Sequence, residues 1–142
     1  MMLPDVNVLV NAYRPENPGH KGFRTWLDAL VNGAEAYAVT DSVINALIRI
    51  TTDRRIYRVP SRLEEVLGFA DLVRNQDHAI VVNPGERHWE IFTRLCEKAG
   101  ARGKLVADAY LAALAIEHGC EFISADRDFA RFPGLRWRHP LD

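Results

Sequence analysis

Residues 105–129 read LVADAYLAALAIEHGCEFISADRDF, and this stretch decides the fold class. Alanines and larger apolar residues fill residues 105–118, which predicts a helix, and Gly119 follows where a helix commonly ends in left-handed backbone. Cys120–Ser124 is short and mostly apolar, as expected of a buried strand. The stretch therefore predicts a helix that runs directly into a strand of a buried sheet.

The same alternation continues toward the rest of the chain. Residues 3–10 predict a strand that then turns into a helix. Further strands are predicted within residues 36–39, 79–82 and 135–139, and helices within residues 20–31, 41–48, 61–73 and 89–99. Strands that alternate with helices are typical of a parallel sheet with right-handed crossovers and helices on both faces. We therefore expect an α/β fold, a three-layer α/β/α sandwich with a central, mostly parallel sheet of about four to five strands. No repeat or linker divides the chain, so residues 1–142 are predicted to form a single domain.

Composition narrows the class of protein. Of the 142 residues, 48% are hydrophobic and 26% are charged, an ordinary balance for one globular domain. No apolar stretch approaches the roughly 20 residues of a membrane-spanning helix, and the N-terminus lacks the basic region of a signal peptide. The formal net charge of −1 excludes a basic field over the whole molecule. Cys96 and Cys120 follow no metal-binding or redox spacing, so we expect free thiols and a cytoplasmic location.

Three carboxylates stand where the predicted elements begin or end. Asp5 lies near the end of the first predicted strand, Asp126 just past the strand at 120–124, and Asp108 in the first turn of the helix at 105–118. Each alone has an ordinary explanation, because turns and helix starts favour aspartate. A buried carboxylate in a strand is costly without a cation, however, and the carboxyl ends of parallel strands meet at one edge of a sheet.

Together, these carboxylates predict a site for a hard cation. No histidine or cysteine follows at metal-binding spacing, and a ligand set of oxygens alone favours Mg²⁺ or Mn²⁺. Such an ion lowers the pKa of a bound water and neutralises phosphate charge. The predicted chemistry is therefore the hydrolysis of phosphodiester bonds.

Segments that contain these carboxylates resemble the motifs of PIN-domain ribonucleases. Leu3–Leu9 resembles the first-strand motif, Val106–Ala115 the central acidic helix, and Ser124–Phe129 the closing motif. The tail Ala130–Trp137 is similar to the mycobacterial branch of the VapC-type toxins, which belong to bacterial toxin–antitoxin pairs. The resemblance covers essentially the whole chain and implies a PIN-like fold.

The resemblance also implies a function and a set of site residues. It implies a Mg²⁺-dependent endoribonuclease that cleaves structured cellular RNA, such as tRNA or rRNA, and that pairs with a VapB-type antitoxin. Asp5 and Asp108 are expected to face the metal, and Asp126 to hold water on the metal or a second ion, with Asp128 as a helper. Site-supporting roles are expected for Asn7, Asn45, Ser124 and Arg49.

One helix departs from the family pattern. The family commonly carries a glutamate on the helix after the second strand, whereas residues 42–49 contain none. Asn45 offers only a neutral oxygen, and Asp41 either caps this helix or reaches the site. Arg49 either contacts phosphate or the antitoxin, or bridges an acid within the fold. The missing charge leaves a second hypothesis open, a PIN-like module that binds RNA or protein with weak or no catalysis.

Other surfaces predict contacts with further molecules. Between Arg49 and Arg62 the chain carries five arginines and one acid. Proteins bind single-stranded RNA with aromatic rings that stack on its bases and with basic side chains that neutralise its phosphates. Contacts with RNA or the antitoxin are therefore predicted for Tyr57 and for its neighbours Arg54, Arg55 and Arg58. An excess of apolar helical surface predicts a homodimer through Trp26, Leu63, Phe69 and Leu72.

Two local patterns predict details of helices. Ser61–Glu64 fits a capping box at the start of a helix. Trp89 lies on a helical stripe with Phe92 and Leu95, which predicts that its side chain belongs to the core.

Overall fold

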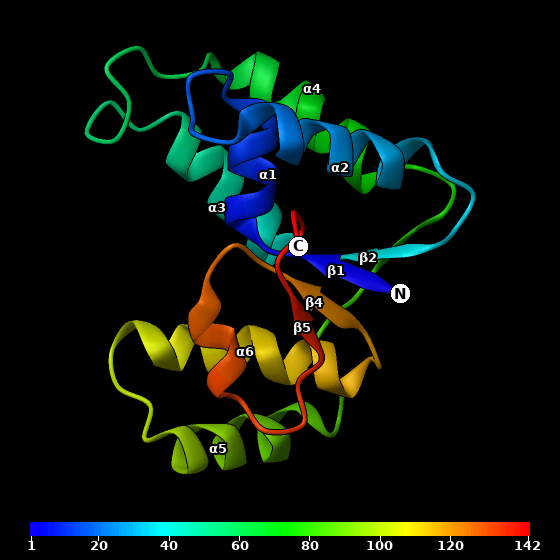
Figure 1. Ribbon diagram of the computed structural model, residues 1–142, viewed down its shortest axis with the longest axis vertical. Coiled ribbons are helices and arrows are strands. Elements are labelled where there is room, and N and C mark those ends of the chain that lie inside the picture. Colours follow the sequence, from blue (N-terminus) through cyan, green and yellow to red (C-terminus); the bar gives the residue numbers. More distant parts are fainter.

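Short strands form the middle layer of the molecule, between two groups of helices (Figure 1). The chain has five such strands. The computed structural model describes residues 1–142. The strands are β1 (Met2–Pro4), β2 (Tyr37–Val39), β3 (Ala79–Val81), β4 (Glu121–Ile123) and β5 (Trp137–Arg138). One parallel sheet has the order β1-β4-β5, and β2 and β3 form a parallel pair. Because β1 and β2 also lie side by side, the two sheets share one layer.

Helices cover both faces of this layer. They are α1 (Val6–Tyr13), α2 (His20–Asn32), α3 (Asp41–Thr51), α4 (Leu63–Arg74), α5 (His88–Ala99) and α6 (Lys104–Glu117), with a 3₁₀ helix, η1, at Arg127–Arg131. Helices α1–α4 lie on one side of the strands, and α5 and α6 lie on the other (Figure 1). This arrangement confirms the predicted three-layer α/β/α sandwich. No helix is both long and apolar enough to cross a membrane.

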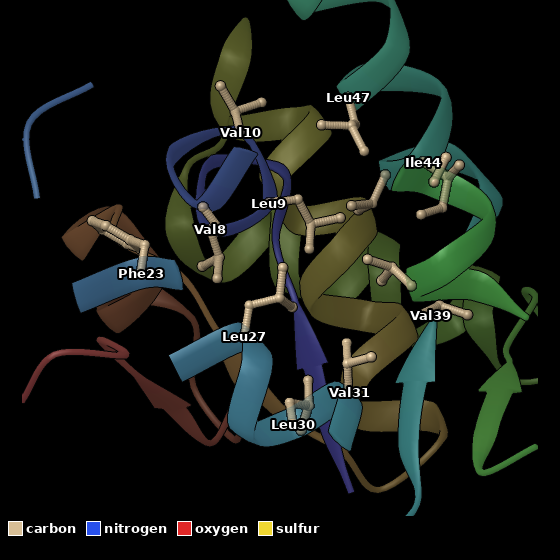
Figure 2. Packing of buried hydrophobic residues seen from close by; sticks show 14 of the residues in the cluster. Val8, Leu9, Val10, Phe23, Leu27, Leu30, Val31, Val39, Ile44 and Leu47 are labelled. Carbon is tan, nitrogen blue, oxygen red and sulfur yellow. The ribbon is translucent and has the colours of Figure 1, made fainter. Parts of the chain in front are cut away.

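A hydrophobic core lies on each side of the strands. Figure 2 shows the larger one, in which Leu9 of α1, Leu27 of α2 and Leu47 of α3 converge between the helices and the strands. On the other side, Ala109 and Ala112 of α6 are fully buried against the sheet. Because alanine is small, α6 lies close to the sheet, which brings Asp108 near the ends of β1 and β4.

The change from strand to helix that is predicted within residues 3–10 occurs at Asp5. β1 ends at Pro4, and α1 begins at Val6. The reason is Asp5, whose side chain accepts a hydrogen bond from the Val6 N–H and caps α1. The strand count in one hydrogen-bonded sheet is lower than predicted, because β2 and β3 pair separately from the three-stranded sheet.

The predicted capping box at Ser61–Glu64 is wrong. Helix α4 begins after Arg62, whose side chain makes no capping hydrogen bond. The Ser61 hydroxyl instead accepts a hydrogen bond from Nη1 of Arg14 at 2.7 Å. The Ser61 hydroxyl therefore hydrogen-bonds to a residue far away in the sequence and does not cap the helix.

Candidate active site

Asp5 is the most deeply buried carboxylate of the site, with 4% of its surface exposed. It follows β1, and its backbone N–H continues the ladder to Ile123 of β4 at 2.8 Å. Ser124 donates its hydroxyl to Oδ2 of Asp5 at 2.7 Å, and the Val6 N–H donates to Oδ1 at 2.7 Å. These bonds fix the carboxylate at the carboxyl ends of the two parallel strands.

Asn7 joins the end of β1 to the turn after β4. Its Nδ2 lies 3.2 Å from Oδ2 of Asp5 and 3.0 Å from the hydroxyl of Ser124, to which it donates. Its Oδ1 accepts the N–H of Ala125 at 3.0 Å. The structure therefore brings Asn7 and Ser124, both predicted to support the site, into direct contact with Asp5.

Asp126 stands in the turn that follows β4. Its Oδ1 accepts the N–H of Asp128 at 2.9 Å, and this bond caps η1. The hydroxyl of Ser124 accepts the N–H of Asp126 at 3.0 Å, which ties the turn to Asp5 through one shared serine. Asp128, predicted to help the site, is exposed and holds the turn through its backbone.

Lys104, which the sequence analysis did not identify, joins the two remaining carboxylates. Its Nζ lies 3.0 Å from Oδ2 of Asp108 and 2.6 Å from Oδ2 of Asp126. The signal in the sequence is the spacing of Lys104 and Asp108, which are four residues apart and therefore neighbours on one helix face. No such spacing reveals the contact with Asp126, because that contact depends on how α6 packs beside β4.

The electrostatics of the cluster follow from burial and crowding. Burial raises the pKa of the Asp5 carboxyl, which the Ser124 and Val6 hydrogen bonds oppose and the charges of Asp108 and Asp126 reinforce. Burial also raises the pKa of Asp108 against the opposing effect of Lys104. For Asp126, the hydrogen bonds from Lys104 and Asp128 outweigh burial and hold its pKa below the usual value.

The donor set fits a hard divalent cation in its chemistry. Asp5, Asp108 and Asp126 offer only oxygens, and the buried Asp5 has no cationic side chain as a hydrogen-bond partner. No three acidic, histidine or cysteine side chains stand close enough to hold a metal ion as they are arranged here. Lys104 instead lies between two of the carboxylates, so the acids share an ammonium group in this arrangement.

Helix α3 lies across an apolar groove from Val106 and Ala107, the residues that precede Asp108 in α6. Asn45 is exposed and makes no hydrogen bond through its side chain, and Arg49 is exposed without an ion pair. Asp41 pairs instead with Arg74 of α4, whose Nε lies 2.6 Å from Oδ1, and this bond lowers the pKa of Asp41. Ala46 of α3 lines this groove of about 520 Å³ beside Val6, the residue after Asp5.

The basic loop after α3 is partly engaged within the fold. Arg54 and Arg58 are exposed and form no ion pair, whereas Arg55 pairs with Asp53 at 3.2 Å. The guanidinium carbon of Arg14 lies 4.1 Å from the centroid of the Tyr57 ring. Tyr57 also packs against the core of the fold, and its hydroxyl accepts a hydrogen bond from Asn17, so this ring is already engaged within the molecule.

The prediction that Trp89 belongs to the core is wrong. Its side chain is 71% exposed on α5, where Ile91 and Leu95 point into the core instead. Its neighbour His88 is buried, and its Nε2 lies 3.0 Å from the carbonyl oxygen of Tyr110. The helix is rotated so that this histidine, and not the tryptophan, faces α6.

Comparison with known proteins gives the family to which the chain belongs. The model of the PIN domain family matches residues 2–135. The chain belongs to the PIN domain family. This PIN domain is 41% identical over 140 residues to ribonuclease VapC25 of Mycobacterium tuberculosis, covering 99% of each chain. It is 42% identical over 142 residues to ribonuclease VapC43 of the same species, covering 100% of this chain and 97% of the relative.

Solved structures share the fold at low sequence identity. The structure of VapBC2 from Rickettsia felis, bound to a DNA fragment from its promoter, contains a chain with a TM-score of 0.68 and 14% identity, with 97% of each chain covered. The structure of VapBC-1 from nontypeable Haemophilus influenzae matches with a TM-score of 0.68 and 14% identity, covering 99% of this chain and 98% of that one. These matches confirm the PIN fold expected from the sequence.

Proposed function

We propose that this PIN domain is a metal-dependent endoribonuclease of the VapC type that hydrolyses phosphodiester bonds of structured RNA. The observation that carries the proposal is the buried Asp5, which lies with Asp108 and Asp126 at the carboxyl ends of β1 and β4. The names of the relatives, which are ribonucleases at about two-fifths identity over the full chain, support the same activity.

In this proposal, Mg²⁺ or Mn²⁺ is held by Asp5, Asp108 and Asp126. Such an ion supplies Lewis acidity and a more acidic water when it is bound. Ser124 and Asn7 keep Asp5 in place through their hydrogen bonds to Oδ2. The chain's own contribution is therefore to hold several negative oxygens together at one fixed point.

RNA is proposed to approach from the side of α3 and its following loop. Arg49, Arg54 and Arg58 are exposed and have no acidic partner, so their charges are available to phosphate groups. Arg55 and Tyr57 extend the same surface, although each already has a contact within the loop region. Such contacts with the backbone of RNA bind it without choosing a sequence.

A VapB-type antitoxin and a second copy of this chain are the proposed protein partners. VapBC complexes are among the structures that share the fold. For the homodimer, Leu63 and Leu72 are 53% and 47% exposed on α4, whereas Trp26 and Phe69 pack partly against the core. The proposed dimer surface therefore consists of the leucines of α4, and the proposed location is the cytoplasm, where both cysteines stay free thiols.

The second candidate function is a PIN-like module that binds RNA or protein but cleaves weakly or not at all. The exposed Asn45, in place of an acid, and the ammonium of Lys104 among the carboxylates favour it. An RNA cleavage assay with Mg²⁺ separates the two functions. If the protein is an enzyme, the wild type cleaves RNA and the Asp5→Asn variant does not. If it is a binding module, neither protein cleaves RNA, and both bind RNA equally well.

A further inference from the structure

The ammonium group of Lys104 lies where two of the proposed metal ligands face each other. It is 3.0 Å from Oδ2 of Asp108 and 2.6 Å from Oδ2 of Asp126. These carboxylates come from different elements, α6 and the turn after β4, and the lysine is the cation that joins them. A metal ion that used the same two oxygens would need the space that this ammonium group fills.

We propose that Lys104 competes with the divalent ion for Asp108 and Asp126. The ion then binds only when the ammonium group leaves these two carboxylates. This inference rests on the proposed function, because it concerns the metal that the proposed reaction requires. Lys104 is a positioning residue in this account. It holds two carboxylates together before the metal binds, and it sets how tightly the metal is held afterwards.

The three side chains differ in how easily they move. The side chain of Lys104 is 70% exposed, whereas those of Asp108 and Asp126 are 11% and 26% exposed. Asp126 is fixed further by the N–H groups of its turn, since it caps η1. Lysine carries a strongly hydrated charge on a flexible stem, so it regains water when it swings outward. The lysine is therefore the partner that leaves, while the carboxylates stay.

Charge explains why the exchange affects both stability and affinity. Without Lys104, the like charges of Asp108 and Asp126 repel each other and the buried Asp5 with no cation between them. The ammonium group relieves this repulsion in the metal-free protein. The affinity for the metal is therefore lower than it would be without Lys104, because two charge-assisted hydrogen bonds must break before the carboxylates are available as ligands.

The test is a calorimetric titration of metal-free protein with Mg²⁺ for the wild type and Lys104→Met. We expect the variant to bind Mg²⁺ roughly tenfold more tightly, because the competing hydrogen bonds are gone. Its melting temperature in EDTA should fall, since the carboxylates then lack a cation. The matched control is Lys98→Met, which removes the same charge at an exposed lysine without an ion pair and should change neither quantity. Lys104→Gln repeats the test with a side chain that stays polar.

The outcomes separate this inference from the proposed function. If wild-type protein binds Mg²⁺ and both Lys104 variants bind it with the same or lower affinity, Lys104 does not compete and the inference is overturned. If neither the wild type nor the Lys104 variants bind Mg²⁺ or Mn²⁺, the proposed metal site itself is overturned. Tighter binding in the Lys104 variants and not in Lys98→Met supports the inference.

Discussion

The two sides of the candidate site hold their charges differently. On the side of α6 and β4, every buried carboxylate has a hydrogen-bond partner, from Ser124 at Asp5 to Lys104 at Asp108. On the side of α3, Asn45 and Arg49 are exposed and make no ion pair. One side is a closed network of hydrogen bonds, and the other is an open surface that carries positive charge.

This difference indicates a division of tasks within the proposed reaction. The closed side concentrates negative oxygens, which suits a divalent cation. The open side leaves arginines without acidic partners, which suits phosphate groups of RNA. Because Asp41, the acid of α3, pairs with Arg74, the proposed metal site has only the carboxylates of the closed side.

Breaking the closed side should have the largest effect. We expect Asp108→Asn to lower the rate of RNA cleavage by about 100-fold or more, because the metal loses a charged ligand. The measurement is the single-turnover rate with Mg²⁺ in excess. Asp77→Asn, at an exposed acid without an ion pair, is the matched control and should cleave like the wild type. Equal rates for Asp108→Asn and wild type would place the chemistry elsewhere.

Adding an acid to α3, on the open side, should give that side a carboxylate that can also hold the metal. Ala46 lines the groove beside Val6, so we expect Ala46→Glu to tighten Mg²⁺ binding by roughly tenfold while lowering the melting temperature in EDTA. Asn45→Glu, one residue earlier at an exposed position, should have a smaller effect on both. Calorimetry and thermal melts measure the two quantities. Unchanged values for both variants would mean that α3 does not face the carboxylates.

Removing a cation from the open side should weaken RNA binding more than catalysis. For Arg49→Ala we expect KM to rise by roughly threefold to tenfold with little change in kcat, and the salt dependence of RNA binding to become shallower. The matched control is Arg24→Ala, at an arginine that pairs with Asp28 on α2. A large loss of kcat for Arg49→Ala would instead place this guanidinium at the reacting phosphate.

The smallest expected effect concerns stability and pH in the absence of metal. Burial holds the pKa of Asp5 above its usual value. Such a group stabilises the fold below its unfolded pKa of about 3.9 and loses this contribution as the pH rises through its folded pKa. We therefore expect the free energy of unfolding in EDTA to fall less steeply between about pH 4 and neutrality in Asp5→Asn than in wild type. Urea unfolding at several pH values checks this, and parallel curves would argue against a buried charge at Asp5.

Most of the fold follows from patterns that are local in the sequence. Helices α2 and α3 lie where the apolar spacing predicts them, because burial of one face decides each. The strands Tyr37–Val39 and Ala79–Val81 coincide with short apolar runs, although Ile80 of the second strand is 44% exposed. The residues within 3–10 predict a strand that turns into a helix, but their spacing does not say where the change occurs. The cap at Asp5 marks the start of α1.

The candidate site is predictable only where its residues end or begin elements. Asp5 and Asp126 follow strands, so topology brings them together. The contact of Lys104 with Asp126 and the pairing of Asp41 with Arg74 join residues far apart in the chain. Neither contact has a local pattern, because both depend on how helices pack against their neighbours.

The most direct test of the central claim is RNA cleavage by the purified chain with Mg²⁺ or Mn²⁺ and then with EDTA in excess. The account predicts cleavage with either metal, none in EDTA, and none with metal when Asp5, Asp108 and Asp126 are all changed to Asn. The triple variant should remain folded by circular dichroism, so that a loss of activity reports the site. Cleavage that persists in EDTA with all three residues changed would contradict the account.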